Sequence, residues 1–167
     1  THLKTLLNSK QVPKDYETSL ERAITSFVQQ NQRYFKDTTL QLIHGDCHLG
    51  NIIHRPEESL YLVDFDDMII GPPVQDLWLF LPDTMKNSNQ EFNWVMEGYT
   101  VFADLPQSSL QLIPYLKCMR QIHFAAWCAI QAKEPHFNHH FPSWGDVKYW
   151  NALIKSINET KNITYSS

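Results

Sequence analysis

The stretch HGDCHLGNIIHRPEESLYLVDFDDMIIGPPVQDL, residues 44–77, decides the fold and the chemistry that this chain can carry. Three polar side chains stand out in it. Asp46 is followed five residues later by Asn51, and Asn51 is followed thirteen residues later by Asp64. The residues between them determine whether these three side chains can meet.

Two short apolar runs, Asn51–Ile53 and Leu60–Val63, flank the polar turn Arg55–Ser59. This pattern predicts an antiparallel β-hairpin. Because a hairpin returns the chain to its starting point, Asn51 and Asp64 should lie side by side, with Asp46 in the loop just before them. Two carboxylates and one amide oxygen would then surround one point.

Oxygen ligands of this kind suit a hard cation such as Mg²⁺, which takes its remaining ligands from water and phosphate. A further carboxylate beside the cation can accept a proton from a hydroxyl group. The kinase motif H-R-D-x-x-x-x-N, followed by D-F-G, has the same order. Here His44–Gly45–Asp46, Asn51 and Asp64–Phe65–Asp66 match it, with Gly in place of Arg and Asp in place of the final Gly. The stretch therefore predicts a phosphoryl-transfer site.

The segments HGDCHLGNI, VDFDD and GPPVQDLW resemble the aminoglycoside and choline kinase branch of the protein-kinase-like enzymes. More closely, they resemble the bacterial stress response group of serine/threonine kinases. The likeness continues less sharply through MRQIHFAAW and FPSWGDVKYW. It implies the C-terminal lobe of an aminoglycoside phosphotransferase-type fold, mainly α-helical with a small β-hairpin. It also implies ATP as the phosphoryl donor and a Ser or Thr hydroxyl of a protein as the acceptor.

The same resemblance implies a role for each polar residue of the motif. Asp46 would be the catalytic base. Asn51 and Asp64 would hold Mg²⁺ against the phosphates of ATP, so that Asp64 counts with Asp46 as catalytic. His44 and Asp76 are expected to support the structure, His44 as a packed and hydrogen-bonded residue. Asp76, near a helix start, can accept backbone N–H groups and would anchor the catalytic loop.

Other polar residues give weaker signals. Cys47 and His48 could line the pocket, and Asp66 and Asp67 could add negative charge or serve as turn carboxylates. Three histidines farther along lie in a Pro- and Asn-containing loop without a Cys or acid partner at metal spacing, which disfavours zinc: His136, His139 and His140.

Composition narrows the class of protein. A chain of 167 residues that is 43% hydrophobic has the size and apolar content of one globular domain. The net charge of −4 gives no reason to expect nucleic acid or an anionic membrane as partner. Three cysteines without metal spacing suit a reducing compartment, and no apolar run or signal peptide points to a membrane. We expect a cytoplasmic monomer.

Two parts of a kinase are missing from the sequence. It contains neither a Gly-rich phosphate loop nor a strand lysine in a V-A-I-K context. In kinases both parts belong to the N-terminal lobe. We therefore expect residues 1–167 to form the C-terminal catalytic lobe, with the nucleotide-cradling lobe absent from this chain, and we expect the chain alone to be inactive.

Helical periodicity predicts most of the remaining elements. An amphipathic helix should span Pro13–Phe35, a short strand Thr39–Ile43 should lead into the motif, and a helix should begin near Val74. Beyond Pro82 the chain reads as helix. The run Leu110–Ile130 is apolar nearly all round, as in a buried central helix.

Two details of the C-terminal part can be predicted. Arg120 and His123 lie within the apolar run, so we expect them to be core polar groups with partners. Ser143 and Asp146 have the spacing of a capping box, which predicts the start of a last helix that runs through Ile157.

Three other functions fit parts of the sequence. A small-molecule kinase acting on an aminoglycoside, choline or homoserine would share the motif. A dinuclear metallophosphatase is disfavoured because residues 1–43 contain no D-x-H, and a non-catalytic pseudokinase because all three core side chains are present. Residues 83–150 carry six acidic and five basic side chains, too small an excess to mark a trap for a cationic acceptor, although their aromatics leave a choline cage open. The closer resemblance favours a protein acceptor.

Overall fold

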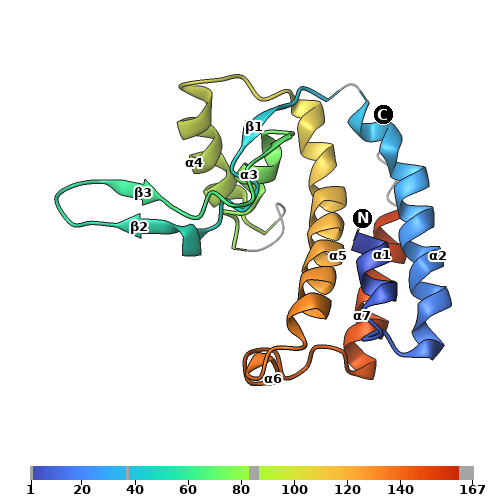
Figure 1. Cartoon of the computed structure of the whole chain (residues 1–167). Coiled ribbons are helices and arrows are strands. Elements are labelled where there is room, and N and C mark those ends of the chain that lie inside the picture. The colour runs from blue at the N-terminus through green and yellow to red at the C-terminus, as the bar shows by residue number, and fades with distance from the viewer. Residues whose placement is uncertain (1, 37, 83–86, 162–167) are drawn as a thin grey trace. The chain divides into compact units, whose positions relative to one another are not determined.

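The computed structural model describes residues 2–36, 38–82 and 87–161 (Figure 1). The chain divides into two compact units, one formed by residues up to 36 and from 114 onward, the other by residues 37–113. Helices predominate and the strands are short, so the predicted class, mainly α with a small β-hairpin, is confirmed. Asp83 and Lys86, which were counted among the charged side chains of residues 83–150, lie outside the described residues.

The first unit is helical. Its elements, with a 3₁₀ turn η1, are α1 (His2–Asn8), α2 (Lys14–Asn31), η1 (Gln32–Phe35), α5 (Ile113–Gln131, in this unit from residue 114 on), α6 (Phe137–His140) and α7 (Val147–Lys161). Helix α2 packs against α7 and α1 (Figure 1). The core of the unit is apolar, and its largest fully buried side chains are Trp150, Tyr115, Leu6, Leu20 and Ile157.

The predicted helix Pro13–Phe35 is close to the observed one. Pro13 is the N-cap of α2, and the α-helix ends at Asn31, after which η1 continues to Phe35 as a 3₁₀ turn. Helix α1 was not predicted, because seven residues are too few for a clear helical period.

Helix α5 is not buried all round, contrary to the prediction. Its side chains Phe124 and Trp127 are each 41% exposed, and they pack against each other and against Phe141. His123, predicted to be a core polar group, is exposed and stacks on His2. Arg120 is half-buried and has an interaction partner. Helix α5 therefore has a buried face and a partly exposed face, although both are apolar in sequence. On the exposed face, aromatic side chains cover one another.

The predicted capping box at the last helix is wrong. Asp146 is itself the N-cap of α7, because its Oδ1 accepts the backbone N–H of Tyr149 at 2.7 Å, three residues on. The helix then runs to Lys161 rather than to Ile157. Ser143 lies outside the helix, so the S-x-x-D spacing was coincidental.

The predicted loop with three histidines contains a short helix instead. His139 and His140 belong to α6, and His136 precedes it as the N-cap. Within the described ranges, no group of three or more His, Cys, Asp or Glu side chains is placed to hold a metal ion.

The second unit contains two small antiparallel sheets. Strand β1 (Gln41–Ile43) pairs with β4 (Ile69–Gly71), with Ile43 opposite Ile69. Strand β2 (Ile52–His54) pairs with β3 (Leu60–Leu62), with Ile53 opposite Tyr61, and forms the projecting hairpin in Figure 1. The hairpin was predicted, except that Asn51 belongs to the 3₁₀ turn η2 (Leu49–Asn51) that precedes it.

Strand β4 was not predicted, and it changes the surroundings of the motif. The strand predicted at Thr39–Ile43 begins at Gln41 and finds its partner in Ile69–Gly71, a run too short to be recognised from its pattern. The loop after β1 and the segment after β3 therefore meet at one place, since β1 pairs with β4 and β2 pairs with β3.

Helices complete the second unit. Helix α3 (Val74–Trp78) begins at Val74, as predicted, and packs against the 3₁₀ turn η3 (Gln107–Leu112). Helix α4 (Asn89–Thr100) lies between them in the sequence. Throughout the described part of the chain, each helix is too short or too polar to cross a membrane.

Candidate functional site

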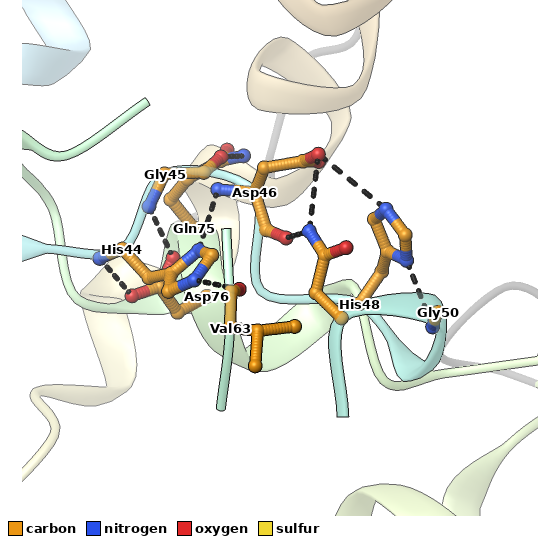
Figure 2. A network of polar contacts seen from close by, with 9 residues as sticks. His44, Gly45, Asp46, His48, Gly50, Val63, Gln75 and Asp76 are labelled. Carbon is orange, nitrogen blue, oxygen red and sulfur yellow. Dashed lines mark hydrogen bonds and ion pairs between the residues drawn. The ribbon is translucent and has the colours of Figure 1, made fainter. Parts of the chain in front are cut away.

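The loop that follows β1 is held by a carboxylate from α3. The backbone N–H groups of His44 and Gly45 donate to Asp76 Oδ2 and Oδ1, at 2.8 and 2.9 Å (Figure 2). Gln75 Nε2 donates to the carbonyl oxygen of Gly45 at 3.3 Å, and Trp78 Nε1 donates to Gln75 Oε1 at 3.2 Å. Asp76 thus accepts N–H groups from the loop rather than from the start of its own helix.

Gly45 is required where the loop turns. Its φ of +85° lies in the left-handed region, which glycine adopts without a steric penalty. A Cβ at this position would overlap with the carbonyl oxygen of Asp67, so the backbone leaves no room for a side chain. The backbone carbonyl of Asp67 thus packs against Gly45. The side chains of Asp66 and Asp67 are both exposed.

His44 joins the loop to the end of the hairpin. The side chain is only 5% exposed, and its ring lies 4.9 Å from that of Phe65, centroid to centroid. Nδ1 accepts the backbone N–H of Asp46 at 3.3 Å, so Nε2 carries the hydrogen and donates to the carbonyl oxygen of Val63 at 3.0 Å. One imidazole therefore links Asp46 to the residue before Asp64.

Asp46 and Asn51 are in direct contact. Asn51 is buried, and its Nδ2 donates to the backbone carbonyl of Asp46 at 3.0 Å and to the carboxylate Oδ2 at 3.5 Å. Because both acceptors are oxygens, this contact also orients the amide, with Oδ1 directed away from Asp46. The second side chain near the carboxylate is His48, whose Nε2 lies 3.4 Å from Oδ2 (Figure 2).

Asp64 lies at the end of the hairpin in an unusual conformation. Its φ is +65°, which few non-glycine residues adopt, although Asp tolerates it better than most. The N–H of the preceding Val63 donates to the carbonyl of Asn51 at 3.0 Å, so the chain passes next to Asn51. The Asp64 carboxylate is exposed and makes no hydrogen bond or ion pair with the residues that the structure describes.

Asn51 and Asp64 fit the protein half of a magnesium site. Asn51 Oδ1 and the Asp64 carboxylate are hard oxygen donors on neighbouring stretches of chain, and neither is used in a described contact. Mg²⁺ usually binds through one or two side-chain oxygens and completes its octahedron with water and phosphate. The donor set therefore suits this cation when it arrives with a phosphate.

Cys47 carries no reactive thiolate. Burial raises the pKa of the Cys47 thiol to about 11, and the carboxylates of Asp76 and Asp46 add to the effect. Cys118 and Cys128 are free and buried as well. Since a neutral thiol is a poor nucleophile and metal ligand, the raised pKa disfavours a chemical role for Cys47.

Sequence reasoning named the charged residues, the histidines and Asn51 of this site, but not Gln75 or the contact between His48 and Asp46. His48 was named only as a residue that could line the pocket, and the structure places it against Asp46. The signal available in the sequence was its position two residues before Gly50, which suits a residue whose side chain caps the turn η2.

Known proteins are similar to this chain in sequence and in fold. A model of the phosphotransferase enzyme family matches residues 4–104. Stress response kinase A of Escherichia coli (strain K12) is 34% identical over 115 residues, which are 69% of this chain and 34% of that protein. Serine/threonine protein kinase RdoA of Salmonella typhimurium is 32% identical over 127 residues, which are 76% of this chain and 38% of that protein.

The matches extend to a solved structure. The crystal structure of spectinomycin phosphotransferase in complex with ADP and spectinomycin superposes with a TM-score of 0.53 at 17% identity, over 97% of this chain and 56% of that chain. The predicted aminoglycoside phosphotransferase-type fold and the resemblance to the stress response kinases are confirmed. The chain spans about a third of the length of the curated relatives it matches.

Proposed function

Since the chain belongs to the phosphotransferase enzyme family, we propose that it supplies the catalytic loop of an ATP-dependent kinase that phosphorylates Ser and Thr hydroxyls of proteins. The observation that carries the proposal is the contact between Asp46 and Asn51 in a loop tied down by Asp76. Such a loop presents a fixed carboxylate next to an asparagine side chain whose amide oxygen faces away from it, an arrangement that suits phosphoryl transfer.

Asp46 acts as the base in the proposed mechanism. Its Oδ2 accepts the proton of the acceptor hydroxyl as the hydroxyl oxygen bonds to the γ-phosphorus of ATP. The bond from that phosphorus to the β,γ-bridging oxygen breaks, and ADP leaves. Asn51 and Asp64 would hold Mg²⁺, which when bound neutralises the charge of the phosphates. His44 and Asp76 keep Asp46 in place through the backbone of the loop. Catalysis then consists of positioning and charge stabilisation.

The proposal also assigns the remaining parts of the kinase to sequence outside these residues. Residues 1–167 would be the C-terminal catalytic lobe, and the Gly-rich loop and the strand lysine that cradle ATP would belong to another part of the protein. The chain alone would then lack one wall and one cation of the nucleotide site. We expect no robust ATP hydrolysis or transfer by residues 1–167 alone.

A small-molecule kinase of the same fold is the second candidate. Phe124 and Trp127, whose rings are partly exposed, form an aromatic cluster with Phe141, and aromatic faces attract quaternary amines. These rings pack on one another, which favours a surface cluster over a cage. The two curated relatives reported above are named as kinases, one of them as a serine/threonine protein kinase, and this supports a protein acceptor.

The test uses the full-length protein and labelled ATP. Acceptors are offered separately under the same conditions: a generic basic protein rich in Ser and Thr, homoserine, choline and kanamycin. The proposal expects label on protein Ser or Thr at a rate well above that on each small molecule. Faster transfer to any of the small molecules would replace it with the second candidate.

A further inference from the structure

His48 uses its two ring nitrogens for two different tasks. Nδ1 accepts the backbone N–H of Gly50 at 3.0 Å, which caps the turn η2. The neutral ring therefore carries its hydrogen on Nε2, the nitrogen that lies 3.4 Å from Asp46 Oδ2 (Figure 2). The ring also packs so closely over Gly50 that a Cβ there would lie 2.7 Å from Cε1. The His48 ring and the turn η2 therefore hold each other in place.

From this geometry we propose that His48 is a positioning residue that holds the Asp46 carboxylate in its reactive orientation. The inference rests on the proposed function, because it presupposes that Asp46 is the base. It goes further in assigning a role to a residue that neither the sequence motif nor the family match specifies.

Two side-chain donors converge on one carboxylate oxygen. Nε2 of His48 and Nδ2 of Asn51 lie 3.4 and 3.5 Å from Asp46 Oδ2. The other oxygen, Oδ1, is buried. Hydrogen bonds to a catalytic base are often long before the reactive complex forms and shorten within it. His48 and Asn51 thus both lie at Oδ2 and restrict the rotation of the Asp46 carboxylate.

Capping alone does not account for a histidine at this position. Asn, Ser and Asp cap turns and helix starts more effectively, and each would accept the N–H of Gly50. The imidazole differs from these side chains in having a second nitrogen farther out, and that nitrogen is directed at Asp46. His48 is 37% exposed at the side chain and Asp46 is 21% exposed, so the pair is within reach of a substrate.

Two substitutions separate the two tasks. In His48→Asn the amide oxygen replaces Nδ1 and keeps the cap, but residue 48 no longer offers a donor to Asp46. In His48→Gln the longer amide places its nitrogen near the position of Nε2, so the donor is kept and the cap is lost. His48→Ala removes both. Each variant is made in the full-length protein, and its Tm, kcat and KM for ATP are measured.

The proposal expects His48→Asn to keep the wild-type Tm and KM for ATP while kcat falls by about 10-fold or more, as expected when a reacting group is misplaced. His48→Gln should have the lower Tm of the two but the higher kcat per folded molecule. A kcat of His48→Asn within about twofold of wild type would show that the cap is the only role. The proposal also fails if His48→Gln is no faster than His48→Asn, or no faster than His48→Ala where His48→Asn does not fold.

Asp46→Asn in the same assay distinguishes the proposed role of Asp46 as base from the proposed role of His48 in positioning it. If it is inactive while His48→Asn is fully active, the positioning role is wrong and the proposed function stands. If Asp46→Asn keeps wild-type turnover, Asp46 is not the base, and the proposed function and the positioning role both fall.

Discussion

At the scale of the residue, the loop that carries Asp46 depends on side chains that bind its backbone. Asp76 binds two successive N–H groups of the loop, and His44 connects Asp46 to Val63. The motif spacing indicated which residues matter, because the residues between Asn51 and Asp64 form a hairpin. A hairpin brings its two ends together, next to the loop that contains Asp46. The spacing did not show that Asp76 reaches back across more than thirty positions to hold the loop, since the resemblance alone supplied that expectation.

Asp76→Ala is expected to destabilise the protein. Two N–H groups would lose a charged acceptor, and hydrogen bonds to charged groups contribute about 1.5–3 kcal/mol each. Urea unfolding should show a loss of about 3 kcal/mol or more. Asp76→Asn, which keeps one acceptor oxygen, should lose less. If Asp76→Ala unfolds like wild type and lacks only activity, Asp76 belongs to the chemistry and not to the support of the loop.

Gly45→Ala tests the crowding of the loop. A methyl group would meet the carbonyl of Asp67 at a φ of +85°, so we expect a large loss of stability and of turnover. The matched control is Gly98→Ala in α4, where a Cβ meets nothing within 4 Å. Replacing a helical glycine with alanine should stabilise by about 0.5–1 kcal/mol. Equal effects of the two substitutions on thermal unfolding would contradict this account of Gly45.

At the scale of the element, periodicity found the long helix α2 and the hairpin but failed on short or two-faced segments. Strand β4 has three residues and α1 has seven, so both are shorter than the windows over which strand or helix periodicity can be judged. Helix α5 was assigned to the core because nearly all its residues are apolar, yet Phe124 and Trp127 are partly exposed. Burial depends on the neighbours that tertiary structure provides, and these are not encoded in the spacing of one segment.

The cap of α7 gives a direct test at this scale. Asp146→Ala removes the acceptor for the N–H of Tyr149 and should cost about 1 kcal/mol in the free energy of unfolding. Asp146→Asn keeps a capping oxygen and should behave nearly like wild type. Ser143→Ala should have no effect, because Ser143 lies before the helix. If Ser143→Ala lowers the free energy of unfolding as much as Asp146→Ala does, the predicted capping box is right after all.

At the scale of the whole molecule, buried neutral groups make stability depend on alkaline pH. Burial raises the pKa of Cys47 and Cys128 to about 11, and that of Cys118 and Tyr149 to about 12. The ordinary values, 9.0 for Cys and 10.0 for Tyr, apply when the chain unfolds. The folded state therefore holds these protons more strongly, and its advantage is complete below about pH 9.

The free energy of unfolding should accordingly fall as the pH rises from about 9 to about 12. Urea unfolding at a series of pH values measures this slope, and Cys128→Ala should make it shallower by removing one of the groups. In the folded protein at neutral pH, a thiol reagent should label the three cysteines slowly, and in urea rapidly. Stability that is constant from pH 8 to 11 would contradict the burial of these groups.

The central claim is that Asp46 accepts the proton of the acceptor hydroxyl, and one comparison tests it most directly. Full-length wild-type and Asp46→Asn proteins are prepared together, and nucleotide affinity and phosphoryl transfer are measured on the same samples. The account predicts unchanged affinity for ATP and a turnover reduced by about 10²-fold or more, because general-base catalysis contributes that much. Near-normal turnover by Asp46→Asn would contradict it.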